Sequence, residues 1–424
     1  MIRWGRRTPS AKLGPNFSKL LGATAVSSVG DGVYLTALPL LALEFTHDPR
    51  LLGLIGAAGE LPWLLLSLHA GALVDRWDHR RVMWRVDAAR FVIVVGLWLA
   101  VLTSHANVAW LVAVAFLLGC GQAFFDVAAP VLLPGVVSRD ERSLVRANGR
   151  MTAALMNGQD LLGPPLGAGL FSLGQSIPLL GNALSFAASS ALIGSIRGRF
   201  VSVGDQSPRQ SLHGEIREGL VWMVRHRVLR ATALTGGLSN AVFSAKAVLL
   251  VLLARDVLHL GNFGYGVLLL IPALGGLVGS VVGPWLATRI GPGTMRCGGM
   301  VVEGLVIAGL GLSSTPWFAG LMMAIAGFTM SLQFIIVGSL KPRIVPARLL
   351  GRVTGAGRLI GLAGTPVGSL LGGVLAAAFG VRVPFLLGGA MMVLVAGLFY
   401  PALSDHSIQK AIDAMRESES LPTR

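Results

Sequence analysis

The chain has 424 residues, of which 53% are hydrophobic and 13% charged, and its mean hydropathy is +0.70. Soluble domains carry about 25% charged residues, so a soluble protein of this size could not hide so much apolar surface. The two cysteines, Cys120 and Cys297, lie in apolar runs and form neither a disulfide framework nor a metal cluster, so we expect no metal site. The net charge of +15 would suit a protein that binds nucleic acid, but the placement of the charge argues against that function.

Apolar segments of membrane length follow one another along the chain in two groups of six, with a polar stretch between the groups. Each segment is long enough to cross about 30 Å of hydrocarbon as a helix. We therefore predict an all-α integral membrane protein with twelve transmembrane helices in two six-helix bundles. The segments lie at 20–44, 52–71, 86–104, 108–130, 150–172 and 177–195, and then at 229–254, 264–287, 297–313, 317–338, 354–379 and 384–402.

The polar stretches divide the chain into five parts. We predict a tail at 1–19, a bundle at 20–195, a linker at 196–228, a second bundle at 229–402 and a tail at 403–424. Within the linker, apolar residues at helical spacing predict a short amphipathic helix over 212–226 on the inner membrane surface. A short helix over 408–415 is expected in the second tail, which otherwise frays.

Lysine and arginine concentrate on one side of the predicted membrane. Of the 35 such residues, 30 fall on the tails and the loops of that side, and only Arg50, Arg255 and Arg382 fall on the other. This asymmetry predicts a multi-pass protein of the cell membrane with both termini in the cytoplasm. Because the charge is spread over many loops as a topology signal, we expect no nucleic-acid partner. The basic N-terminal stretch has no small-residue cleavage site before a soluble domain and is interpreted as a cytoplasmic tail, not a signal peptide.

A densely charged loop joins the second and third apolar segments and reads GALVDRWDHRR over 71–81. Its spacing resembles the loop between helices two and three of the major facilitator superfamily, Gly-x-x-x-Asp-Arg-x-Gly-Arg-Arg. The matching positions are Gly71, Asp75, Arg76 and Arg80, while Asp78 stands in place of Gly and His79 in place of Arg. This variant resembles the branch that holds the enterobactin exporter and related drug exporters.

The two groups of helices also share a sequence pattern. The stretch PGVVSRDERSLVRANGR before GPPLGAGL is echoed in the second half by PRIVPARLLGRVTGAGR before GTPVGSLLGG. The echo pairs Pro134 with Pro342 and Arg150 with Arg358. Two homologous halves related by an axis along the membrane normal are the architecture of the superfamily, so the resemblance implies this fold over nearly the whole chain.

Ionisable residues inside spans are costly and are functional candidates by default. Asp31, at the middle of the first helix between two glycines, is our first candidate for proton coupling; the alternative is a hydrogen bond to a neighbouring helix. Glu60, in the second helix, is the second candidate, and it could equally line the cavity or pair with Arg90. Together with Asp31, Lys246 and Glu303 are candidates for the substrate cavity, and these two could also pair with each other.

Asp87 and Arg90 lie at positions i and i+3 near the start of the third helix. We expect them to form an inner-surface charge network with Asp75 and Arg76. The resemblance implies that this loop, which also carries Arg80 and Arg81, latches the two halves in the outward-facing state. The alternative is a simple positive anchor at the membrane surface. Asp126, near the inner end of the fourth helix, is expected to pair with a loop arginine, Arg146 or Arg150.

The fifth helix carries a glycine pattern. Gly158, Gly163, Pro164 and Gly167 resemble the antiporter motif Gly-x8-Gly-x3-Gly-Pro-x2-Gly-Gly. The central gap is one residue too long, and Ala168 replaces the last Gly. Such glycines let two helices pack tightly. The fourth helix lacks the intramembrane arginine that many proton-coupled drug exporters show there.

These features together predict a secondary active transporter that exports amphipathic small molecules such as drugs, siderophores or secreted metabolites. We expect the proton as coupling ion, a lipid bilayer as environment, a monomer, no cofactor and no enzymatic activity, since no phosphate-binding Gly-Lys-Ser/Thr loop is present. The alternatives are a nutrient importer or permease, and a non-transporting membrane scaffold.

Overall fold

The computed structural model describes residues 13–74, 77–137, 140–198, 200 and 212–420, and all regular structure in them is helical. The first half forms one bundle. Its helices are α1 (Pro15–Phe45), α2 (Pro49–Val74), α3 (His79–Leu102), α4 (Val108–Val136), α5 (Glu141–Met156), the π-helical segment η1 (Asn157–Leu162), α6 (Gly163–Leu173) and α7 (Ile177–Gly194). The segments α5, η1 and α6 follow one another without a break and make up the fifth span.

The second half forms a second bundle. Its helices are α9 (Arg227–Leu252), extended by the π-helical segment η2 (Leu253–Val257), α10 (Asn262–Arg289), α11 (Pro292–Leu312), α12 (Pro316–Ile344), α13 (Ala347–Phe379) and α14 (Arg382–Leu403). Two further helices, α8 (Leu212–Arg225) and α15 (Asp405–Ser420), precede and follow this bundle. Within the described chain, nine helices are long and apolar enough to cross a membrane, and α2, α3 and the fifth span complete the predicted twelve.

The helices extend beyond the apolar segments that predict them. The third helix begins at His79, seven residues before the predicted 86, because Asp78 caps it and accepts hydrogen bonds from the backbone N–H groups of Arg80 and Arg81. In the same way Asp140 caps α5 and accepts a 2.9 Å hydrogen bond from the Ser143 N–H. Hydropathy therefore marks the membrane-embedded part of each helix, while capping residues decide where the helix starts.

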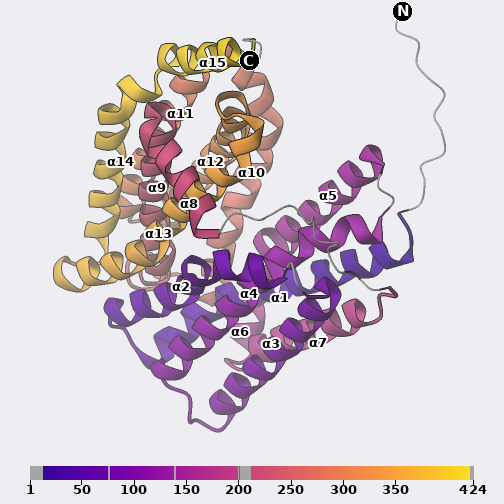
Figure 1. Ribbon diagram of the computed structural model, residues 1–424. Helices are drawn as coiled ribbons and strands as arrows, with labels where there is room; N and C mark the ends of the chain where they lie inside the picture. The colour runs from indigo at the N-terminus through magenta and orange to yellow at the C-terminus, as the bar shows by residue number, and fades with distance from the viewer. Residues whose placement is uncertain (1–12, 75–76, 138–139, 199, 201–211, 421–424) are drawn as a thin grey trace, which may run out of the picture.

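The two bundles pack together near the connection between α1 and α2. A Cβ atom on Gly53 of α2 would lie 2.6 Å from the Ser369 carbonyl oxygen of α13, and one on Gly266 of α10 would lie 2.9 Å from the Pro164 carbonyl oxygen of α6. Both close approaches lie on the side of the molecule opposite to the starts of α1 and α15. Toward those starts the bundles diverge (Figure 1).

The helices α8 and α15 both pack on the second bundle. The predicted linker helix is present as α8, whose Glu218 forms an ion pair with Arg352 of α13. The helix α15 is longer than the predicted 408–415 and does not fray near its start, because Ile408 and Ile412 are buried against the bundle. Its Asp405 accepts a 2.7 Å hydrogen bond from the Gly293 N–H at the start of α11.

Candidate functional site

Asp31 lies half-buried on α1, and the glycines on either side of it bring α1 against two other helices. A Cβ atom on Gly30 would overlap the Ser185 side chain of α7. A Cβ atom on Gly32 would overlap the Gln159 carbonyl oxygen of η1. The backbone around Asp31 is therefore held between α7 and the fifth span, which fixes the position of this carboxylate inside the first bundle.

The glycines of the helix-five pattern lie on the other side of the contact between α1 and the fifth span, which we call the seam. A Cβ atom on Gly158 would lie 2.6 Å from the Cβ of Ser28, and one on Gly167 would lie 2.7 Å from the Val33 carbonyl oxygen, both on α1. Gly163 lies between them and packs directly on the backbone of α1. The carbonyl of the neighbouring Pro164 meets α10, as described above. The pattern thus joins α1, the fifth span and the second bundle.

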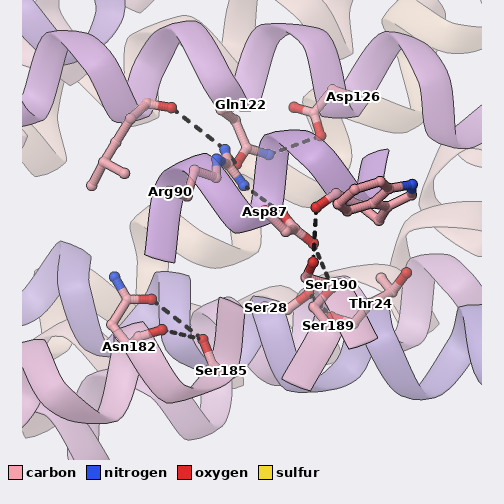
Figure 2. Close-up of polar contacts among 12 residues, drawn as sticks. Thr24, Ser28, Asp87, Arg90, Gln122, Asp126, Asn182, Ser185, Ser189 and Ser190 are labelled. Carbon is pink, nitrogen blue, oxygen red and sulfur yellow. Dashed lines mark hydrogen bonds and ion pairs between the residues drawn. The ribbon is translucent and has the colours of Figure 1, made fainter. Parts of the chain in front are cut away.

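A buried ion pair lies at the centre of the first bundle. Asp87 is 0% and Arg90 2% exposed, and a carboxylate oxygen of Asp87 lies 3.7 Å from Nη1 of Arg90. The Ser189 hydroxyl of α7 donates a 2.6 Å hydrogen bond to the other oxygen of Asp87 (Figure 2). Both side chains point into the bundle, where Asp87 ties α3 to α7 through Ser189. The expected network with Asp75 and Arg76 lies outside the described residues and stays a prediction.

Polar contacts continue from the ion pair onto α4. Arg90 donates a hydrogen bond to the side-chain oxygen of Gln122, whose nitrogen donates a 2.8 Å hydrogen bond to Asp126 (Figure 2). The expected pairing of Asp126 with Arg146 or Arg150 is therefore replaced by a contact on its own helix. The contacts form a continuous chain from Ser189 through Asp87, Arg90 and Gln122 to Asp126.

Negative charge exceeds positive charge around this chain. The guanidinium of Arg90 interacts electrostatically with three carboxylates, namely Asp87 on its own helix, Asp31 on α1 and Asp126 on α4. Arg358 of α13 also interacts electrostatically with Asp126, so two guanidinium groups face three carboxylates, and uncompensated charge is costly away from water. The arrangement favours a site that holds protons on some of its carboxylates.

The residues of the predicted gating loop fall into two sets. Asp75 and Arg76 lie outside the described residues, and Gly71 lies in the last turn of α2. Arg80 donates a 2.5 Å hydrogen bond to the Ile196 carbonyl after α7, and Arg81 lies 3.9 Å from Asp78. Both described contacts stay within the first half, where they hold the start of α3.

Glu60 is half-buried on α2, one helical turn from Trp63. The alternative in which Glu60 pairs with Arg90 does not hold, because Arg90 contacts Asp87 and Gln122 instead. Glu60 therefore stays a candidate for the cavity between the bundles.

The second bundle holds its own buried charges. Lys246 of α9 is 8% exposed, with its ammonium 4.4 Å from the centre of the Phe243 ring, and it interacts electrostatically with Glu303 of α11. Glu303 also interacts with Arg296, which is 5% exposed and donates a 3.1 Å hydrogen bond to Thr235. Lys246 also borders a small crevice that is otherwise lined by apolar side chains such as Leu249, Ile307 and Phe385.

Sequence reasoning missed four residues of these clusters. Arg296 directly precedes the apolar run 297–313 and Arg358 lies near the start of the run 354–379, so both count toward the inner side in the charge asymmetry rather than as candidates within a span. Gln122 and Ser189 are neutral, and nothing in a single sequence shows that they bond to Arg90 and Asp87. A count of charges within the full helices finds Arg296, and a strict count within the predicted runs finds Arg358.

The family model for the Major Facilitator Superfamily matches residues 20–365 of the chain. The chain belongs to this superfamily. Its twelve spans in two bundles are therefore the fold of a membrane transporter, and the relatives are transporters and not enzymes.

Relatives resemble the chain over nearly its full length. The multidrug efflux pump Tap of Mycobacterium tuberculosis (strain ATCC 25618 / H37Rv) is 27% identical over 421 residues, covering 95% of this chain and 97% of its own. Among solved structures, the nucleoside transporter NupG has a TM-score of 0.76 at 13% identity, covering 92% of this chain and 100% of its own. A bacterial homologue of the lysosomal transporter Spinster also has a TM-score of 0.76 at 13% identity, covering 95% and 99%. These structures support the fold alone.

Proposed function

We propose that this transporter exports amphipathic small molecules across the cell membrane and that protons drive the export. The similarity to a multidrug efflux pump along the whole of both chains carries the proposal. The branch-specific loop variant and the helix-five glycines agree with it. A drug, a siderophore or a secreted metabolite would each fit this class of substrate.

The packing of the bundles supports a specific conformation in the transport cycle. The bundles touch through α2 and α13 and through α6 and α10, at the end remote from the starts of α1 and α15. With both termini in the cytoplasm, as the charge asymmetry predicts, this is the inward-facing state. Alternating access would then break these glycine contacts and close the bundles at the opposite end, where loop 71–81 is the proposed latch.

The charge balance of the first bundle supports proton coupling. Asp31, Asp87 and Asp126 all interact with Arg90, and Arg358 of the second bundle adds one further cation at Asp126, so a proton on one of the carboxylates lowers the charge imbalance. Asp31 is the member placed on a helix that we expect to line the cavity. We propose that it loads a proton from the outside and releases it to the cytoplasm while substrate moves outward, with Glu60 as the second candidate.

Efflux measurements test the proposal. Cells that express the protein should accumulate less ethidium than cells with an empty vector, and a pH gradient should drive efflux from proteoliposomes. Asp31→Asn should still bind substrate but should abolish pH-driven uphill efflux, while Glu60→Gln, as the matched control, should have the smaller effect. Full pH-driven efflux by the Asp31→Asn protein would remove Asp31 from the coupling mechanism, and equal ethidium accumulation in both cell types would count against export.

A further inference from the structure

A cation of α13 lies over an aromatic ring of α2 in the interface between these two helices. The helices α2 and α13 run antiparallel and pack against each other. Gly53 of α2 packs on the backbone around Ser369 and Gly373 of α13. The Arg358 guanidinium of α13 lies 4.8 Å from the centre of the Trp63 ring of α2. Trp63 follows Gly53 by ten residues, or about 15 Å along the helix. Trp63 and Arg358 therefore lie nearer the open side than Gly53 and Ser369 do.

Arg358 also interacts with the carboxylate chain of the first bundle. It acts electrostatically on Asp126, which ends the polar chain that starts at Ser189. Arg358 itself is exposed, while Trp63 and Asp126 are half-buried. An aromatic ring and a carboxylate of the first bundle therefore interact with an exposed cation of the second bundle.

An aromatic face beside a carboxylate is a general recognition site for organic cations. We propose that Trp63 and Asp126 form a cation subsite of the substrate cavity, that Arg358 occupies it as an internal ligand in this conformation, and that an organic cation binds by displacing Arg358. The inference rests on the proposed function only in taking the space between the bundles as the substrate cavity. Displacing Arg358 would also remove one contact between α2 and α13, so substrate binding would loosen the interface that must open.

The repeat of the chain offers a matched control for Arg358. Its partner in the first half is Arg150, which is exposed on α5. The variants Arg358→Gln and Arg150→Gln therefore remove the same charge from equivalent positions of the two halves. The probe is tetraphenylphosphonium, with tetraphenylborate as an anion of the same shape, and the measurement is equilibrium binding to the purified full-length protein.

We expect Arg358→Gln to bind tetraphenylphosphonium about fivefold more tightly than the unaltered protein, because the competing internal cation is gone. Binding of tetraphenylborate should not tighten, Arg150→Gln should leave both affinities unchanged, and Trp63→Ala should weaken cation binding. Arg358→Lys keeps the charge but lacks the planar guanidinium, so it should tighten binding by less than Arg358→Gln. Arg358→Lys provides a second test if Arg358→Gln does not yield monodisperse protein.

The inference is overturned if Arg358→Gln binds the cation no more tightly than the unaltered protein does. It is also overturned if neither protein binds the cation. The same holds if Arg358→Gln is not monodisperse and Arg358→Lys binds the cation no more tightly. Equal tightening for the anion also overturns it, because the effect would then not depend on charge. Binding at equilibrium requires no transport, so tighter binding without ethidium efflux would contradict the proposed export alone. Efflux without tighter binding would contradict the subsite alone.

Discussion

Replacing Arg90 with Gln should destabilise the first bundle strongly, because the replacement leaves Asp87 charged and buried. Asp87 is 0% exposed, and within the described residues the Ser189 hydroxyl at 2.6 Å would be its remaining hydrogen-bond donor. Removing one partner of a buried ion pair costs about 3–5 kcal/mol, against about 1 kcal/mol for one neutral hydrogen bond. Combining Arg90→Gln with Asp87→Asn removes both charges, so the free-energy losses of the two exchanges should not add.

Thermal unfolding of the purified protein in detergent measures this double-mutant cycle. We expect Arg90→Gln to lower the apparent Tm by on the order of 5–10 °C, and the double variant to lose less than the sum of the two single variants. Arg81→Gln is the control, since that side chain is 64% exposed and its ion pair with Asp78 is long at 3.9 Å. Additive losses, or an Arg90→Gln protein as stable as the control, would refute the role of Arg90 as the counter-charge of Asp87.

Three further predictions follow from packing, burial and topology. Gly163→Val should clash with the backbone of α1 and lower the free energy of unfolding by about 1–3 kcal/mol. Gly169→Val should cost less, because nothing lies within 4 Å of its added Cβ. Equal apparent Tm values would contradict close packing of the fifth span on α1. Burial lowers the pKa of His226 below its usual 6.5, so the unfolded chain binds more protons just below that pH and stability should fall as the pH drops through this window. The pH slope should shrink in His226→Gln, and an unchanged slope would exclude His226 as its source. In a background without native cysteines, Asn107→Cys should react with an impermeant thiol reagent in intact cells while Glu141→Cys should not, and the reverse pattern would invert the proposed orientation.

The sequence predicts the number and position of the membrane helices because the hydrocarbon core demands a long apolar run for each crossing. It does not predict where those helices end. Asp78 and Asp140 start α3 and α5 several residues before the apolar runs begin, since a capped polar turn continues a helix outside the membrane. The same effect hides Arg296, which looks like a loop residue in the sequence but is buried within α11.

The site is only partly predictable for a different reason. Asp31 stands out as a carboxylate at mid-span, and the glycines beside it suggest close packing. Its environment depends on which faces of α1, α3, α4 and α7 meet, and that is decided by tertiary packing rather than by local pattern. The sequence therefore indicates Asp87 and Arg90 as a pair, but not their inward direction or their continuation to Gln122.

The cap that Asp405 places on α11 has a consequence for the order in which the protein is made. The Gly293 and Thr294 N–H groups and the Thr294 hydroxyl all donate to Asp405, which follows them by more than a hundred residues. During synthesis the first turn of α11 is therefore made before its cap exists, so water must satisfy these donors until Asp405 arrives, and the apolar surface that later covers Ile408 and Ile412 is still uncovered. The capped start of α11 therefore forms only after the final helix has been made, and a chain that ends before Asp405 lacks this cap.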